Sequence, residues 1–194
     1  MQVDTRGKAK LLLNLANYAD SDEDMDYYIH NLSFWIGGDE VEEISRHLQK
    51  ILKERPNLVD LLVKIVGNMK DSWPAYRRLA IIDALLGVKN LIPINRMPEI
   101  LWERSDALIS LGRYEESLTE ATMNLDLCPA NNHKLQFGIH ITLGDVKRTM
   151  ASTSKEVQES ISHLKKALTI SKRYNITKFR DIAACETVGT SVKS

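Results

Sequence analysis

The apolar residues of this chain recur three and four positions apart along most of its length, which is the period of an amphipathic α-helix. Leu11, Leu12 and Leu15 show this spacing near the start, and Leu164 and Leu168 show it near the end. No segment alternates apolar and polar residues between hairpin turns, as a half-buried strand does. The pattern predicts an all-α chain of about nine or ten helices.

Glycine, proline and capping residues stand between the apolar segments and predict where the helices begin and end. Ser21 with Asp24 resembles a capping box, the residue before Pro56 disfavours the α region, and Gly87 fits a helix C-cap. The longest segment without helical period is 88–98. The predicted helices cover about 5–19, 21–36, 41–55, 57–69, 72–86, 98–111, 114–128, 133–150, 154–174 and 178–188.

The segment Pro98–Asn131 has the spacing of a helical hairpin and is 34 residues long. Gly112 allows the chain to reverse between two helices, Ser117 is small where the helices approach, and Pro129 stops the second helix. This segment resembles a tetratricopeptide repeat. Its repeat-defining residues are Leu108, Leu111, Gly112, Tyr114, Ser117, Leu118, Ala121, Leu125 and Pro129. It departs from the family pattern at Arg104-Ser105, where leucine and glycine are usual, and at Asn124, where alanine is usual.

The next segment fits a second repeat, because a helix pair leaves an apolar face that a further pair covers. Gly138 is the small residue of its first helix and Ser160 that of its second, with Leu164 and Ala167 following. Their separation is about ten residues longer than in a 34-residue unit. It resembles the extended repeats of kinesin light chains and bacterial peptide-sensing regulators.

The resemblance implies antiparallel helix pairs stacked as a tetratricopeptide-like α-solenoid. We expect an N-terminal helical region over 1–90, either degenerate repeats or a separate part, and an array over 91–194 that ends in a capping or truncated helix. In this family the first helix of each pair lines the concave, partner-binding face. The resulting candidates are Glu99, Trp102, Asp106, Ile109, Ser110, Gln136 and His140. Trp102 has a second interpretation, as a core residue packed on the preceding helix. The lysine and asparagines that clamp chaperone C-termini in some members are not expected here, since Trp102 and Asp106 stand at those places.

Composition and charge narrow the class of protein. Apolar residues make up 43%, charged residues 27%, and the formal net charge is zero, so no overall charge attracts nucleic acid or lipid. Two cysteines are too few for a disulfide scaffold, and no apolar run is long enough to span a bilayer. We expect a cytoplasmic or nuclear protein. Basic pairs at Lys165-Lys166 and Lys172-Arg173 indicate either a preference for acidic partners or a solvated helix face.

Motifs for chemistry are absent from the sequence. In "DSDEDMD", Met25 and Asn31 stand where an EF-hand loop needs glycine and glutamate. The five histidines lack metal-ligand spacing, Cys128 fits a structural thiol, and no phosphate loop occurs. We therefore expect no catalytic residue, no metal and no cofactor.

These patterns predict a protein-interaction module, an adaptor or scaffold subunit that binds a peptide or helix, with neither membrane nor nucleic acid as partner. The alternative is a peptide-sensing transcriptional regulator in which residues 37–67 form a helix-turn-helix. Its turn, "KERPN", is awkward, and the second helix, "LVDLLVKIVG", offers few polar side chains for base edges.

Overall fold

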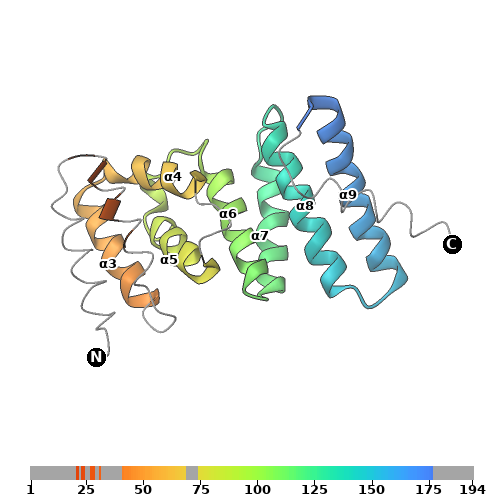
Figure 1. Ribbon diagram of the computed structural model, residues 1–194, viewed down its shortest axis with the longest axis horizontal. Helices are drawn as coiled ribbons and strands as arrows, with labels where there is room; N and C mark the ends of the chain where they lie inside the picture. The colour runs from red at the N-terminus through yellow and green to blue at the C-terminus, as the bar shows by residue number, and fades with distance from the viewer. Residues whose placement is uncertain are drawn as a thin grey trace. The chain divides into compact units, whose positions relative to one another are not determined.

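The computed structural model describes residues 21, 23–24, 27–28, 31, 41–68 and 74–176 of the 194-residue chain. The two continuous stretches form seven α-helices and one short 3-10 helix, without a strand (Figure 1). The predicted all-α class is therefore confirmed for this part of the chain. The helices predicted over about 5–19 and 178–188 lie outside the described residues, so the count of nine or ten stays a prediction.

The helices follow one another with short connections. They are α3 (Val41–Glu54), α4 (Leu58–Asn68), α5 (Ala75–Leu86), the 3-10 helix η2 (Lys89–Leu91), α6 (Met97–Ser110), α7 (Tyr114–Leu127), α8 (His133–Met150) and α9 (Ser154–Tyr174). These bounds lie within a few residues of the predicted ones, because proline, glycine and capping residues determine where each helix stops.

Two compact units divide the chain, one over Met1–Ala107 and one over Leu108–Ser194. The division falls inside α6, whereas the sequence analysis placed its domain boundary after residue 90, in the connection between α5 and α6. The first unit holds α3, α4, α5 and most of α6, and the second holds α7, α8 and α9.

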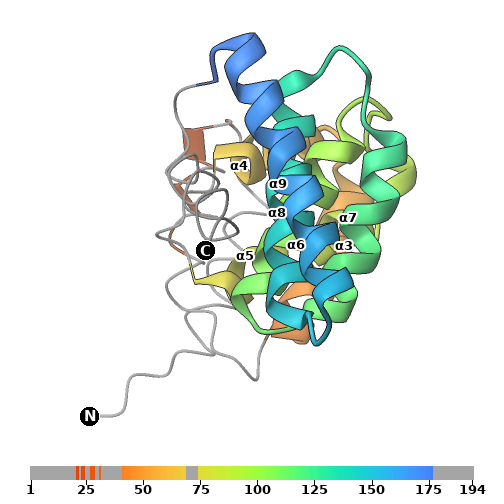
Figure 2. The same ribbon diagram turned by 90° about the vertical axis from the view of Figure 1, so that its right-hand side faces the viewer.

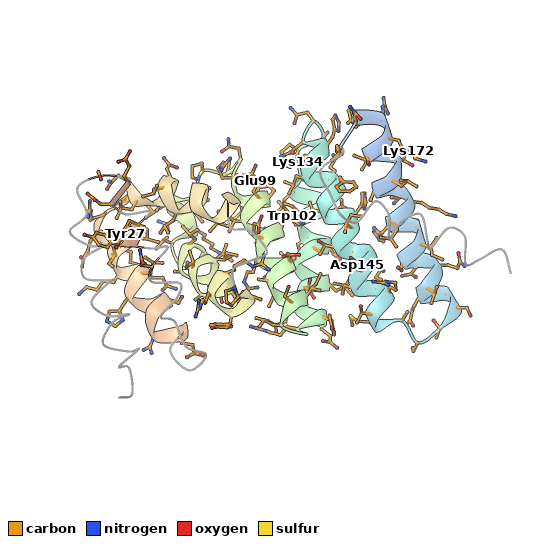
Figure 3. The ribbon with its side chains drawn as sticks, in the orientation of Figure 1. Tyr27, Glu99, Trp102, Lys134, Asp145 and Lys172 are labelled. Carbon is orange, nitrogen blue, oxygen red and sulfur yellow. The ribbon has the colours of Figure 1, made fainter. Side chains whose placement is uncertain are left out.

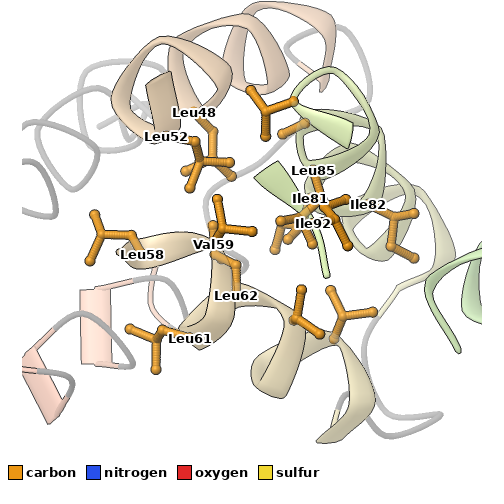
Figure 4. Close-up of a cluster of buried hydrophobic side chains, with 14 of the residues drawn as sticks. Leu48, Leu52, Leu58, Val59, Leu61, Leu62, Ile81, Ile82, Leu85 and Ile92 are labelled. Carbon is orange, nitrogen blue, oxygen red and sulfur yellow. The ribbon is translucent and has the colours of Figure 1, made fainter. Parts of the chain in front are cut away.

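The first unit has an aliphatic core contributed by α3, α4, α5 and the segment that follows α5 (Figure 4). Leu52, Leu62 and Ile81 are among its completely buried side chains. Burying a side chain of this size stabilises the fold by about 1.5–3 kcal/mol. The core residues shown in the figure include Leu48, Leu52, Leu58, Val59, Leu61, Leu62, Ile81, Ile82, Leu85 and Ile92.

Two of the predicted helix-end residues act as expected. The backbone N–H of Asp24 donates to the Ser21 hydroxyl oxygen at 3.1 Å, and that hydroxyl donates to the Asp24 carboxylate at 2.8 Å. Gly87 is the C-cap of α5 in a right-handed conformation with φ −67°. A Cβ at Gly87 would lie 2.3 Å from the end of the flexible Gln49 side chain of α3, which would have to move.

The turn after α6 depends on Gly112. This residue has φ +73°, a left-handed conformation that disfavours other residues. The N–H groups of Gly112 and Arg113 donate to the carbonyls of Ile109 and Leu108, both at 2.9 Å, and so close the helix end. The predicted reversal at Gly112 is therefore confirmed.

The small-residue positions of the first repeat-like segment are buried. Ser105, Ser117 and Asn124 are 0% exposed, and Ala121 is 1% exposed. Two of these, Ser105 and Asn124, are departures from the family pattern, yet each occupies a buried position.

Helices α8 and α9 form an antiparallel hairpin in the second unit, and both views show them side by side (Figures 1 and 2). The Ser160 hydroxyl donates to the Gly144 carbonyl at 2.8 Å in a buried position. A Cβ at Gly144 would lie 2.5 Å from a Leu164 methyl group. Gly138 was the predicted small-residue counterpart of Ser160, whereas the glycine that contacts Ser160 is Gly144. The reason is that residues facing each other across a hairpin are equally far from its turn.

Both ends of this hairpin are fixed. At the turn, the Thr153 side chain and Glu156 form a complete capping box at the start of α9. At the open end, the rings of His133 and Tyr174 stack with their centroids 3.5 Å apart. The start of α8 and the end of α9 therefore lie together, as a rigid hairpin requires.

Candidate functional site

The candidates on α6 in the first unit differ in what their side chains contact. Glu99 pairs with Arg96 at 3.0 Å on the surface, and Trp102 is half-buried. The carboxylate of Asp106 accepts a hydrogen bond from the Arg78 guanidinium at 2.8 Å. Figure 3 shows Glu99 and Trp102 on α6. Glu99 and Asp106 are therefore both ion-paired within the unit, and both keep exposed surface.

Charged side chains join α5 to α6 within the first unit. Arg78 has a guanidinium only 5% exposed, which lies 3.8 Å from Glu103 as well as 2.8 Å from Asp106. Arg104 donates to the carboxylate of Asp83 at 2.6 Å. Neither pairing was predicted, because each joins residues more than twenty positions apart.

The candidates in the second unit also have different surroundings. Ile109 is half-buried and Ser110 is exposed. The amide of Gln136 donates to the carbonyls of Pro129 and Ala130 at 3.3 Å, which ties α8 to the first part of the loop that follows α7. Gln136 therefore braces this loop while remaining half-exposed.

His140 requires a correction. It was predicted to face a partner, but it is 8% exposed and its ring lies against His163 of α9. The reason is that α8 is covered by α9 along this side, so a residue on it packs inside the hairpin. The Nδ1 atoms of the two rings are 3.1 Å apart. One ring must donate and the other accept, so this contact requires at least one neutral ring.

The surroundings of the histidine pair favour the neutral form of both rings. Burial lowers the pKa of His140 to about 4, and the charges of His163 and Lys166 act in the same direction. Burial also lowers the pKa of His163, together with Lys166 and Lys147, while Glu159 opposes the shift. Protonation of either ring is therefore less favourable in the folded protein than in water.

Acidification is expected to destabilise the second unit through this pair. The pKa of His140 is lower in the folded state than its unfolded value near 6.5. Neutral His140 therefore makes its full contribution to the free energy of unfolding above about pH 6.5. This contribution is lost as the pH falls toward 4, by about 2–3 kcal/mol. Urea unfolding at several pH values should show this slope in the wild type and a smaller one in His140→Gln. The exposed His47→Gln is the control, and equal slopes in the two variants would contradict the assignment.

The surroundings of the Cys128 thiol lower its reactivity. Burial raises the pKa of the Cys128 thiol, which therefore stays protonated and weakly nucleophilic at neutral pH.

Within the described residues, no three His, Cys, Asp or Glu side chains gather in a way that could hold a metal ion. The helices of the same part of the chain include none with the length and apolar character to cross a bilayer.

Comparison with known proteins gives no match to a family model, to a curated protein or to a solved structure. The functional interpretation therefore depends on the residues themselves. Sequence reasoning missed Gly144, His163 and Arg78. A glycine inside an apolar helix segment was the only signal for the first of these.

Proposed function

We propose that this chain is a tetratricopeptide-like helical protein that binds another protein, as an adaptor or as a scaffold subunit of a larger assembly. The observation that carries the proposal is the α8–α9 hairpin, closed tightly at Gly144 and Ser160. Burial of the small residues Ser105, Ser117 and Ala121 also supports it. Helices held in this way present side chains in fixed positions, which reduces the ordering cost of binding.

The proposed contact residues are those first-helix candidates that retain surface. They are Glu99 and Trp102 on α6 in the first unit, and Ile109, Ser110 and Gln136 in the second. Tryptophan concentrates binding energy at protein interfaces, so Trp102 is the proposed anchor. His140 is assigned instead to internal packing through its contact with His163. Asp106 is assigned to pairing with Arg78, although its side chain is 45% exposed.

The DNA-binding alternative is disfavoured by α4, which would be its recognition helix. Leu58, Leu61, Leu62 and Val66 of this helix are buried, and Asp60 is its exposed acidic residue. A recognition helix needs exposed polar side chains for base edges, and a carboxylate repels phosphate.

Trp102→Ala is expected to reduce capture of the partner from cell extract at least tenfold, because truncating an interface tryptophan costs about 2 kcal/mol or more. The measurement is affinity capture with quantitative mass spectrometry. The control is Ile94→Ala, since Ile94 is 90% exposed and offers an isolated apolar side chain. Equal loss in both variants, or no loss in either, would reject Trp102 as the anchor.

A further inference from the structure

The exposed face of α9 carries four cations in its last three turns. Lys165, Lys166, Lys172 and Arg173 are all exposed, and the chain has no carboxylate between Ser160 and Ile176. The two acidic residues of α9 lie earlier and are engaged, Glu156 in the capping box and Glu159 with Lys147 at 2.7 Å. The end of this helix is therefore a surface of one charge. We name these four residues the basic face.

Two ordinary roles of charged residues on a helix surface explain only part of the basic face. Cations in a last turn stabilise a helix through its dipole, and this explains Lys172 and Arg173. The effect fades within one turn, so it does not explain Lys165 and Lys166. Pairs with carboxylates three or four positions away are the other ordinary role. The sequence has no carboxylate at those positions, and among the described residues none of the four cations has an acidic partner.

The cations form two rows along the helix. Lys165 and Lys172 are seven residues apart, as are Lys166 and Arg173, so each row repeats after two turns, or about 10 Å. Between the rows lie the exposed small side chains of Ser162 and Thr169. A second helix could approach this narrow polar strip closely and place carboxylates of the same repeat against both rows.

The open end of the hairpin adds a further cation. The stacked rings of His133 and Tyr174 bring the start of α8 beside the end of α9. The exposed Lys134 follows His133, and Figure 3 shows Lys134 and Lys172 at this same end of the hairpin. Lys134 therefore adds positive charge to the end of the hairpin at which the basic face lies.

We propose that the basic face of α9 binds an acidic helical segment of a partner protein, by charge complementarity with carboxylates repeated every seven residues. This surface is separate from Trp102 and adds a second contact to the proposed function. The face lacks exposed large apolar residues between its rows, which insertion into a membrane surface needs. The aromatic ring at this end, Tyr174, stacks on His133 and lies 5.5 Å from the Arg173 guanidinium, so its contacts are already made within the hairpin.

The test is a fluorescence-anisotropy titration of the full chain with a labelled helical peptide of about three heptads that carries glutamates at two positions of each heptad. A scrambled peptide of the same composition is the peptide control. Lys165→Gln/Lys172→Gln is expected to weaken binding about fivefold. Lys53→Gln/Lys89→Gln removes two exposed cations of the first unit and is expected to change binding less than twofold.

A charge-swap measurement distinguishes a loss of binding caused by the charge change from one caused by misfolding of the variant. Lys165→Glu/Lys172→Glu should bind better than the wild type to a peptide in which lysines replace the glutamates at one of the two heptad positions, the one that faces this row. Equal binding of the ordered and scrambled peptides, or equal loss in the two glutamine variants, would overturn the proposal. Tighter binding of duplex DNA or of vesicles containing phosphatidylserine through the same lysines would overturn it as well. Trp102→Ala should bind the acidic peptide like the wild type, so failure of the Trp102 proposal is distinguishable from failure of this one.

Discussion

Replacing Arg78 with methionine is expected to destabilise the first unit by about 3 kcal/mol, because it removes the buried cation that lies against the carboxylates of Asp106 and Glu103. Glu103 has a side chain only 15% exposed, and removing one partner of a buried pair costs about 3–5 kcal/mol. We expect a loss at the lower end of this range, because the Asp106 side chain is 45% exposed and water can solvate its carboxylate when Arg78 is absent. Methionine preserves the packing of the aliphatic stem, so urea unfolding of the full chain measures the charge effect.

A rescue separates lost charge from lost packing in this variant. Arg78→Met/Glu103→Gln/Asp106→Asn removes the charges on both sides and is expected to recover most of the loss, since uncharged partners do not need the cation. The neighbouring Arg77→Met is the matched control. Arg77 lies 5.5 Å from the Tyr76 ring centroid, a contact worth about 0.5–1 kcal/mol. No recovery in the triple variant would show that Arg78 acts through its shape.

Leucine in place of Gly144 is expected to destabilise the second unit by about 3 kcal/mol or more. A single Cβ at this position would already lie 2.5 Å from Leu164, and leucine adds three further carbons. Overpacking of this kind typically costs about 1–3 kcal/mol and sometimes more. Urea unfolding measures the loss, and the exposed Thr149→Leu on the same helix should change stability by less than about 0.5 kcal/mol.

A double-mutant cycle identifies the neighbour responsible. Leu164→Ala alone should cost about 2–5 kcal/mol through the cavity it leaves. Because Leu164 is the side chain that a residue at 144 would meet, Gly144→Leu/Leu164→Ala should be destabilised by less than the sum of the single variants. Strict additivity would mean that Gly144 and Leu164 do not share this space.

Local features of this fold could be predicted from the sequence, and pairings between helices could not. The helix breaks near Pro56 and Gly112 follow from backbone preferences of single residues, which act wherever the chain goes. The contact of Gly144 with Ser160 depends on how far each lies from the hairpin turn, and the family pattern suggested Gly138 instead.

The polar contacts between helices are further pairings that could not be predicted from the sequence. His140 and His163 are twenty-three residues apart, and Arg78 and Asp106 are twenty-eight apart. No local pattern links such residues, since either member alone is compatible with a solvated helix surface. His140 was therefore assigned to a binding face, although α9 covers it.

Photo-cross-linking tests most directly whether this chain uses its α6 surface to bind another protein. A benzophenone amino acid is placed at position 102 in one variant and at position 94 in another, and each is irradiated in cells. We predict a protein adduct of defined mass from position 102 and none from position 94. Adducts of equal yield from both positions, or none from position 102, would contradict the proposed function.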